Sequence, residues 1–365
     1  PLDFSEFITL ARAAGAEPVC VTAVDSMFQK ADEHHEAASL EDLLRNAAEW
    51  VGYSRRNGCG VRHWEVGNES FFHASAEEYA RVFEMFARAM KEADPEARIG
   101  AVAVYGEDAG HHDSRKGCGT PWNRPLLERA SGLVDFLAVH DYPNWGWKDY
   151  RGYLARDPDF TAGIRRTREA VRKWAKAEDA GRISIALTEY GAIDYARDGW
   201  KNVSDLGHAL LLLNMVGQYL AEPELDMAMM WNTRWVKTGE EPPSVHDALR
   251  ADNGLNATGM VLEIWSRFIG DEMVAAEGGR PLKVFATRDS RSGRLNVLLI
   301  NKGLEPQELA LEVRNRPVSG ARRWRFYGAG PEDTKPVFEE AGGVAFKRGK
   351  AKLTLSAVSL TVLSF

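Results

Sequence analysis

Two stretches of sequence decide the fold: WEVGNES at Trp64–Ser70 and ISIALTEYG at Ile183–Gly191. Each is a short apolar run that ends in a glutamate, Glu69 in the first stretch and Glu189 in the second. Apolar runs of this length are typical of buried strands. The carboxyl ends of parallel strands meet at the same edge of a sheet, so the two carboxylates can face each other across one pocket.

The rest of the chain up to about residue 270 alternates between apolar runs and stretches with apolar residues at helical spacing. This alternation predicts parallel strands joined by crossover helices. The runs are apolar without a break, as in strands that are covered on both faces. We expect strands at Glu17–Asp25, Arg62–Glu69, Arg98–Tyr105, Val134–Tyr142, Arg182–Gly191 and Asp226–Trp235. We expect helices at Asp3–Ala14, Leu40–Arg56, Ala76–Ala93, Trp122–Ala130, Thr161–Ala177, Asp205–Leu220 and Met260–Ile269.

The pattern contains six strand–helix units, preceded by one helix at Asp3–Ala14. A closed (β/α) barrel needs eight such units. We therefore predict an α/β fold of the TIM (β/α)8-barrel type over residues 1–270, with the first two strands absent from this chain. A chain that does not close into a barrel is the alternative. Because the chain opens on Pro1 without an initiator Met, we expect a processed product or a fragment, from which an export signal could already be gone.

After about residue 271 the sequence changes to short apolar runs separated by Gly, Pro, Asn and charged residues. This pattern predicts an all-β module over residues 271–365, most simply an antiparallel sandwich. We expect its strands at Val284–Arg288, Leu295–Asn301, Leu309–Val313, Ala321–Tyr327, Lys352–Ser356 and Ser359–Ser364.

The composition is that of an ordinary globular protein, with 44% hydrophobic and 27% charged residues in a chain of 365. The net charge of −7 and the lack of a Lys/Arg run argue against a nucleic-acid partner. No apolar stretch reaches membrane-span length and the chain shows no signal peptide, so we expect no membrane partner. A cytoplasmic and a secreted location both stay open, as does assembly into homo-oligomers.

Three cysteines do not make a disulfide framework in so long a chain. Cys20 lies inside an apolar run and is expected to be a core thiol. Cys59 precedes a predicted barrel strand and Cys118 follows one, which puts them at opposite ends of the barrel. We expect no bond between them.

The two glutamates suit glycoside hydrolysis, in which one carboxylic acid protonates the leaving oxygen while one carboxylate attacks the sugar or activates water. We predict Glu69 as the general acid/base and Glu189 as the nucleophile. Two carboxyl groups close together split in pKa, so that one is protonated while the other is ionised. Their oxygens should then lie about 5–5.5 Å apart, the spacing of a retaining mechanism. Glu65, inside the same run, is expected to have a structural role.

Polar and aromatic residues near the same strand ends could bind a sugar. The amide of Asn68 can bond a sugar hydroxyl. His140 and Tyr142 point the same way by strand alternation, and they could hold Glu189 or contact the sugar; a core histidine is the alternative for His140. The expected aromatic contacts are Trp145, Trp231 and Trp235, with Trp147 and Trp200 in loops at the same end of the barrel.

The sequence gives little support for a metal or a cofactor. His34-His35 and His111-His112 are adjacent pairs, whose side chains diverge rather than chelate. No HExxH, CxxC, EF-hand, phosphate-loop or GxSxG pattern is present. We therefore expect no cofactor and no catalytic metal, with a structural ion near His111 or His112 as the open alternative.

The motifs at Trp64–Glu69 and Thr188–Gly191 resemble those on the fourth and seventh barrel strands of the retaining glycoside hydrolases of clan A. Within the clan, the first motif and the trailing β-sandwich are most similar to glycoside hydrolase family 51, which comprises α-L-arabinofuranosidases and some endoglucanases. Family 39 xylosidases share much of the layout.

This resemblance implies roles for individual residues: Asn68 as binder of the 2-hydroxyl, Glu69 as acid/base, Glu189 as nucleophile, His140 and Tyr142 as sixth-strand support, and Trp231 as eighth-strand aromatic platform. Two features depart from the family. The second-strand arginine that contacts the nucleophile has no counterpart here. The segment His140–Pro143 and the compact C-terminal module also differ from typical arabinofuranosidases.

The leading hypothesis is therefore a retaining glycosidase acting on plant cell-wall polysaccharide or its oligosaccharides, most similar to an α-L-arabinofuranosidase. The loop tryptophans suit an endo-β-1,4-glucanase (cellulase) or a β-xylosidase as the alternative. The expected absence of the first two strands motivates a hypothesis of another class, a non-catalytic carbohydrate-binding protein on a decayed barrel.

Overall fold

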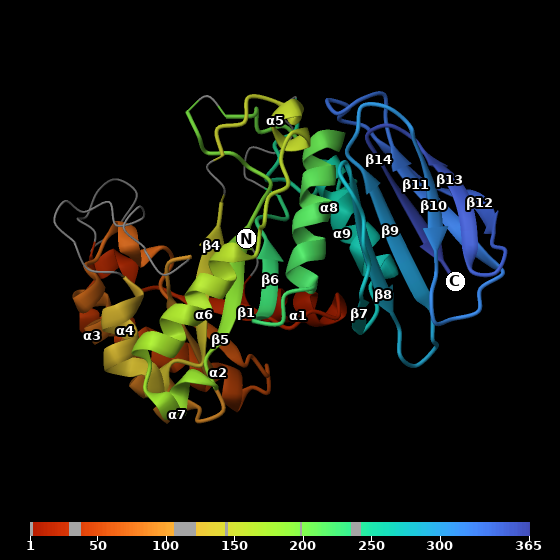
Figure 1. Cartoon of the computed structure of the whole chain (residues 1–365). Helices are drawn as coiled ribbons and strands as arrows, with labels where there is room; N and C mark the ends of the chain where they lie inside the picture. The colour runs from red at the N-terminus through yellow and green to blue at the C-terminus, as the bar shows by residue number, and fades with distance from the viewer. Residues whose placement is uncertain (1–2, 29–37, 106–121, 143–144, 198, 235–241) are drawn as a thin grey trace. The chain divides into compact units, whose positions relative to one another are not determined.

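The computed structural model describes residues 3–28, 38–105, 122–142, 145–197, 199–234 and 242–365 (Figure 1). The chain divides into two compact units. The first consists of Pro1–His140, Thr161–Thr188 and Glu224–Ala228, and the second of Asp141–Phe160, Glu189–Pro223 and Met229–Phe365.

A six-stranded sheet follows the order of the chain, β1-β2-β3-β4-β5-β6. The pairings from β1 through β4 are parallel, with Cys20 opposite Trp64 and Gly100 opposite Phe136. Strands in chain order with helices between them confirm the predicted α/β alternation. The strands are β1 (Val19–Thr22), β2 (His63–Val66), β3 (Arg98–Val102), β4 (Phe136–Asp141), β5 (Ser184–Tyr190) and β6 (Leu225–Met230).

The first strands end earlier than the sequence predicted. β1 stops at Thr22 rather than Asp25, and β2 stops at Val66 rather than Glu69. The reason in β2 is that Gly67 has φ 85° and Glu69 has φ 50°, both outside the extended region that a strand needs. Glu69 therefore lies on a turn beyond the strand.

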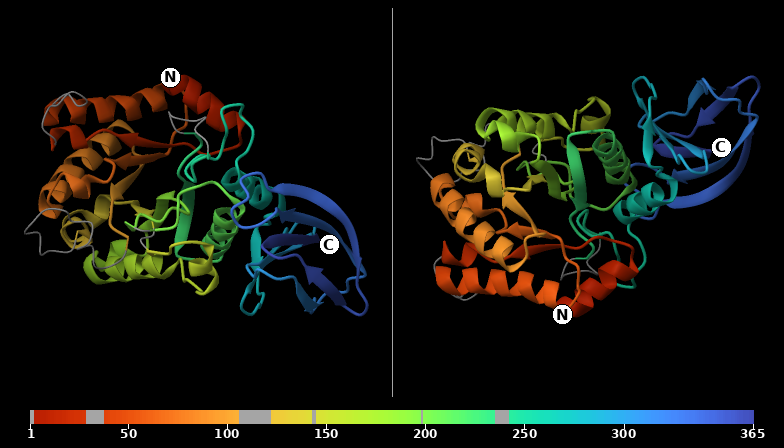
Figure 2. Two further views of the ribbon diagram at one scale, coloured as in Figure 1. Left: turned by 90° about the horizontal axis from the view of Figure 1, so that it is seen from above. Right: turned by 90° about the horizontal axis from the view of Figure 1, so that it is seen from below.

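Helices of the first unit cover the outside of its strands, as the two views of Figure 2 show for the red-to-yellow part of the chain. Neighbouring helices α2, α3, α4 and α6 contact one another in chain order. Asp3, Ser39 and Ser75 cap helix starts by accepting backbone N–H groups. The helices are α1 (Phe4–Ala13), α2 (Leu40–Arg56), α3 (Ala76–Ala93), α4 (Asn123–Ala130), α6 (Ala162–Trp174) and the short α7 (Ala177–Ala180).

The inner face of the sheet is filled by side chains from successive strands. Phe136 of β4, with Ala138 and Ala186, forms a buried cluster against which Met227 packs. A Cβ atom on Gly100 would lie 2.1 Å from the Phe136 ring, so the ring occupies the space that a larger residue on β3 would need. Gly100 on β3 thus leaves room for the large Phe136 side chain of β4.

The second unit contains helices α5 (Tyr150–Leu154), α8 (Leu206–Leu220) and α9 (Ala257–Phe268). Helix α8 is buried on almost every side, which fits its run of leucines. Helix α5 was missed by the sequence prediction because five residues carry too little periodicity to recognise.

From Glu272 onward the elements are antiparallel strands. The larger sheet has the order β12-β11-β14-β9-β8-β7 and the smaller pairs β10 with β13. Apolar residues of both sheets form one core, including Leu299, Leu353 and Leu363. The strands are β7 (Glu272–Val274), β8 (Leu282–Arg288), β9 (Leu295–Asn301), β10 (Gln307–Glu312), β11 (Gly320–Tyr327), β12 (Val337–Ala345), β13 (Lys350–Leu355) and β14 (Ser359–Ser364).

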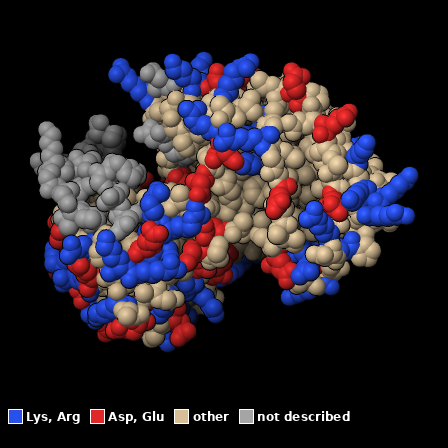
Figure 3. Space-filling model, in the orientation of Figure 1, with Lys and Arg blue, Asp and Glu red and all other residues tan. Residues whose placement is uncertain are grey.

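Charges of both signs are intermingled on the face drawn in Figure 3. Among the described residues, no helix combines the length and the apolar composition that crossing a bilayer requires. Cys20 and Cys59 are free thiols, and Cys118 lies outside the described residues.

Candidate active site

Glu69 occupies a turn that is fixed by its neighbours. The N–H of Gly67 donates to the carbonyl of Thr22 at 3.0 Å, so the backbone follows β1 for one residue beyond β2. The buried Tyr79 of α3 donates its hydroxyl to the Val66 carbonyl and accepts the N–H of Val102, both at 2.7 Å, which ties the ends of β2 and β3 together. Glu69 then adopts the left-handed conformation (φ 50°, ψ 36°) before the short helix η2 (Ser70–Phe72).

His140 of β4 is the partner of Glu69. Its Nδ1 lies 3.0 Å from Oε1 of Glu69, where a protonated Nδ1 donates to the carboxylate. The imidazole is 8% exposed and the Glu69 side chain 31% exposed, so the pair is sheltered but reachable. The sequence suggested that His140 could hold Glu189 or contact the sugar; the structure adds a hydrogen bond to Glu69 that the sequence did not predict.

Glu189 is the penultimate residue of β5 and is half-buried. The phenol of Tyr142 donates to its Oε2 at 2.7 Å, which is one of the two roles that the sequence left open for Tyr142. A phenol at neutral pH is a donor to an ionised carboxylate, and a bond to the charged form favours that form. Tyr142 therefore supplies Glu189 with a direct hydrogen-bond donor.

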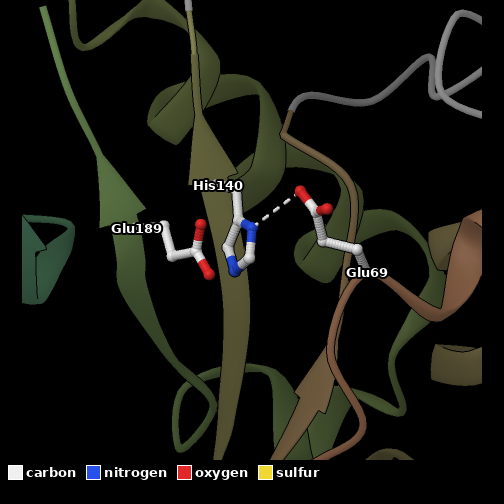
Figure 4. A group of neighbouring side chains, drawn as sticks. All are labelled: Glu69, His140 and Glu189. Carbon is white, nitrogen blue, oxygen red and sulfur yellow. Dashed lines mark hydrogen bonds and ion pairs between the residues drawn. The ribbon is translucent and has the colours of Figure 1, made fainter. Parts of the chain in front are cut away.

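The end of β4 thus serves both glutamates. His140 and Tyr142 are two residues apart, and two side chains at that spacing point the same way in extended backbone. His140 bonds Glu69 and Tyr142 bonds Glu189. Figure 4 shows the group formed by Glu69, His140 and Glu189. One carboxylate oxygen of each glutamate and one ring nitrogen of His140 all lie within 4.8 Å of one another.

Two carboxylates and an imidazole are also residue types that bind metal ions. In the part of the chain that the structure describes, these three form the one group of His, Cys, Asp or Glu with the spacing to do so. His111 and His112, the sequence alternative for an ion, lie outside the described residues.

The remaining predicted contacts that the structure describes are exposed or half-buried. Asn68 is exposed, Trp231 is half-buried just after β6, and Trp235 lies outside the described residues. Trp145 is half-buried and stacks on Trp147 with ring centroids 4.1 Å apart.

Two loop tryptophans do not face solvent. Trp147 stacks on Tyr153, and Trp200 stacks on the buried His208 with centroids 3.7 Å apart. The expectation that they help to line a carbohydrate cleft is therefore wrong, because their faces pack against protein.

Sequence reasoning missed an aromatic pair beside Tyr142. Tyr195 is 57% exposed and packs edge-on against Tyr142 at 5.5 Å, and the His246 ring lies 6.5 Å from both. Burial lowers the pKa of His246, which favours the neutral ring. No local pattern marks either residue, because they reach Tyr142 from different loops.

Comparison with known proteins agrees with the resemblance drawn from the two motifs. The family model described as "Alpha-L-arabinofuranosidase 1 domain" matches residues 2–147. The chain is 26% identical over 174 residues to an intracellular exo-α-(1→5)-L-arabinofuranosidase of Streptomyces lividans, covering 44% of this chain and 24% of the relative. A Bacillus subtilis protein of the same description is 26% identical over 166 residues, covering 42% and 31%. The chain thus spans less than a third of the length of these curated relatives.

Solved structures share the fold over nearly the whole chain. The α-L-arabinofuranosidase of Thermotoga maritima, in a complex with arabinose, has a TM-score of 0.72 at 17% identity, covering 99% of this chain and 78% of that one. A family 44 xyloglucanase of Paenibacillus polymyxa has a TM-score of 0.69 at 13% identity, covering 99% and 83%. At identities this low, the TM-scores establish a common fold and nothing more. Between the arabinofuranosidases and the family 44 enzymes, the motifs and the family model favour similarity to the arabinofuranosidases.

Proposed function

We propose that this chain, similar to the family 51 α-L-arabinofuranosidases, carries the active site of a retaining glycoside hydrolase. Glu69 acts as general acid/base and Glu189 as nucleophile. The observation that carries the proposal is the pair of hydrogen bonds from one strand end, His140 to Glu69 and Tyr142 to Glu189. Each carboxylate receives its own partner, and the partners differ in chemistry.

In the first step Glu189 attacks the anomeric carbon and Glu69 protonates the departing oxygen. In the second step Glu69 takes a proton from water, which displaces Glu189 from the sugar. The spacing supports double displacement: one oxygen of each carboxyl lies within 4.8 Å of the other. Retaining enzymes have carboxyls about 5–5.5 Å apart, whereas inverting enzymes leave about 6.5–9.5 Å for a water.

For the fold, we propose that β1 to β6 correspond to the third to eighth strands of a (β/α)8 barrel. Support comes from the chain-order sheet and from solved arabinofuranosidases that this chain matches over 99% of its length. We also propose a catalytic domain over residues 1–270 and a β-sandwich over residues 271–365, since every described element from Glu272 on is a strand.

For the substrate, we propose an α-L-arabinofuranoside from plant cell-wall polysaccharide or its oligosaccharides. The family model and the names of the curated relatives support this choice. The endoglucanase alternative rested on an open aromatic cleft, and the burial of Trp147 and Trp200 removes two of its supports. Asn68, Trp145 and Trp231 remain as proposed sugar contacts, Asn68 because it is exposed beside Glu69.

Hydrolysis of three substrates by the purified protein tests the proposal: aryl α-L-arabinofuranoside, aryl β-xyloside and carboxymethylcellulose. We expect turnover of the arabinofuranoside, and none with Glu189→Gln, which excludes a contaminating enzyme. Turnover of the xyloside or the cellulose alone would contradict the substrate choice. Oligosaccharide binding without turnover of any substrate would support the carbohydrate-binding alternative instead.

A further inference from the structure

The carboxylate of Asp25 holds the Glu69 turn from both sides. Asp25 begins the short helix η1 (Asp25–Met27), three residues after β1 ends. Its Oδ2 accepts the backbone N–H of Asn68 at 2.7 Å, and its Oδ1 accepts the hydroxyl of Ser70 at 2.5 Å. These donors belong to the residues immediately before and after Glu69, so a rotation of the Glu69 backbone must stretch one of the two bonds.

The backbone of Glu69 needs such support. Its left-handed conformation is uncommon for a residue with a side chain. Conformations of this kind persist where the surrounding structure fixes them, and they cluster at functional sites. The bond from Gly67 to Thr22 fixes the turn up to residue 67, and the Asp25 carboxylate continues the anchoring through residues 68 and 70.

Asp25 is not an ordinary surface acid. It is half-buried, and each of its oxygens is engaged by the turn. Burial raises the pKa of Asp25, while the hydrogen bonds from Ser70 and Asn68 act in the opposite direction. In both bonds an oxygen of Asp25 is the acceptor. An asparagine in its place would keep one acceptor oxygen and would replace the other with an NH2 donor.

We infer that Asp25 is a positioning residue for the general acid/base: through Asn68 and Ser70 it holds Glu69 against Nδ1 of His140, in the orientation that proton transfer requires. The inference rests on the proposed function, because it assigns a role relative to the acid/base step. It predicts a kinetic signature that simple destabilisation lacks.

The test compares substrates that need protonation with substrates that do not. Asp25→Asn keeps the shape of the side chain but turns an NH2 group toward one of the two donors. A small misplacement of a catalytic group can cost about 100-fold in rate. We expect kcat/KM on aryl arabinofuranosides with poor leaving groups to fall by about 10- to 100-fold, and kcat/KM on activated aryl arabinofuranosides to fall much less, because their leaving groups need little protonation.

Two further variants separate positioning from folding. Asp135 also accepts a backbone N–H at 2.7 Å, from Ile99, but it lies directly before β4, at the opposite end of that strand from His140. Asp135→Asn perturbs a comparable bond to a backbone N–H, together with the ion pairs of Asp135 to Lys91 and Arg182, so we expect lower thermal stability with an unaltered dependence on the leaving group. Ser70→Ala removes one of the two Asp25 bonds and should give a smaller effect of the same kind as Asp25→Asn, should the latter fold poorly.

A double variant decides whether Asp25 acts through Glu69. If it does, adding Asp25→Asn to Glu69→Ala should change kcat less than about 2-fold, because the group being positioned is gone. Equal losses on all aryl groups, or the same loss in the presence and absence of Glu69, would overturn the inference while leaving the proposed function standing. Inactivity of the parent protein on every glycoside would remove the proposed function itself, and this inference with it.

Discussion

At the scale of single residues, the two glutamates differ in the side chain that forms a hydrogen bond with each carboxylate. Glu69 faces an imidazole, which can give and take a proton near neutral pH. Glu189 faces a phenol, which keeps its proton near neutral pH and donates a hydrogen bond to the carboxylate. The two environments therefore fit the proposed roles, Glu69 as general acid/base and Glu189 as nucleophile.

The acid/base role of Glu69 predicts selective loss in Glu69→Ala. Aryl arabinofuranosides with poor leaving groups should lose about 10²–10⁴-fold in kcat/KM, since a positioned acid contributes about that much. Activated substrates should still form the glycosyl-enzyme, because their leaving groups need little protonation. Steady-state rates across a series of aryl leaving groups measure this. Equal losses along the whole series would remove the acid/base assignment.

Tyr142→Phe should weaken turnover without disturbing the fold. The lost hydrogen bond to a charged group contributes about 1.5–3 kcal/mol, so we expect about a 10- to 150-fold loss in kcat/KM. Tyr150→Phe is the matched control, because its phenol donates at 2.7 Å to the Lys302 carbonyl. We expect the control to lower the melting temperature and to leave kcat/KM nearly unchanged. A Tyr142→Phe enzyme as active as the control would contradict the role given to this phenol.

At the scale of elements, local signals predicted the helices better than the strand ends. Helices α2 and α3 begin and end at the predicted residues, since their starts carry serine caps. The end of β2 was predicted three residues late, because a positive φ at Glu69 has no signature in its residue type. The motif still brought Glu69 to the correct edge of the sheet. The bond of Tyr142 to Glu189 was among the predicted options, but the bond of His140 to Glu69 was not. These residues are far apart in the sequence, so no local pattern shows which of them pair.

The turn at Gly67 packs closely against the residues around η1, so a side chain at this position should be destabilising. A Cβ atom there would lie 2.4 Å from Ser70 Oγ and 2.6 Å from Val24 Cγ1. Gly58 has a similar φ of 66° but no atom within 4 Å, so Gly58→Ala should cost only the left-handed strain of about 1–2 kcal/mol. Gly67→Ala should cost about 1–3 kcal/mol more through overpacking, and it should also lower kcat. Urea unfolding of both variants measures the difference; equal losses would show that the turn has room to relax.

At the scale of the whole chain, two patterns of apolar residues set two kinds of sheet. Unbroken apolar runs predicted the parallel sheet, and short apolar runs separated by Gly, Pro, Asn and charged residues predicted the antiparallel strands, among them β13. Strands β7 and β12 escaped prediction because one has three residues and the other is largely exposed. Asp25 and Tyr195 escaped as site residues for a different reason: each acquires its role from a neighbour far away in sequence.

Lys302 in the second unit predicts a pH dependence of stability. It is buried, donates to the carbonyls of Tyr153 and Arg156, and burial lowers its pKa to about 8 from an ordinary value of 10.5. Between these two pH values the unfolded chain binds more protons at this site than the folded chain. The contribution of Lys302 to stability should therefore rise as the pH increases from about 8 to 10.5.

Denaturant unfolding of the parent and of Lys302→Met at several pH values between 7 and 10.5 isolates this contribution, because other groups cancel in the difference. The advantage of the parent should grow with pH. The exposed Lys350→Met serves as control and should show no such trend. A difference that stays constant with pH would contradict the burial of a titrating amine.

The most direct test of the central claim is the anomeric configuration of the glycosyl azide that each glutamate variant forms from an activated aryl arabinofuranoside. In Glu189→Ala, azide can occupy the space of the lost carboxylate and attack from that face, so rescue should yield the inverted azide. In Glu69→Ala, azide should instead attack the glycosyl-enzyme and yield the retained azide. Opposite configurations from the two variants are what the two-glutamate account predicts. The same configuration from both, or turnover by Glu189→Ala without azide, would contradict it.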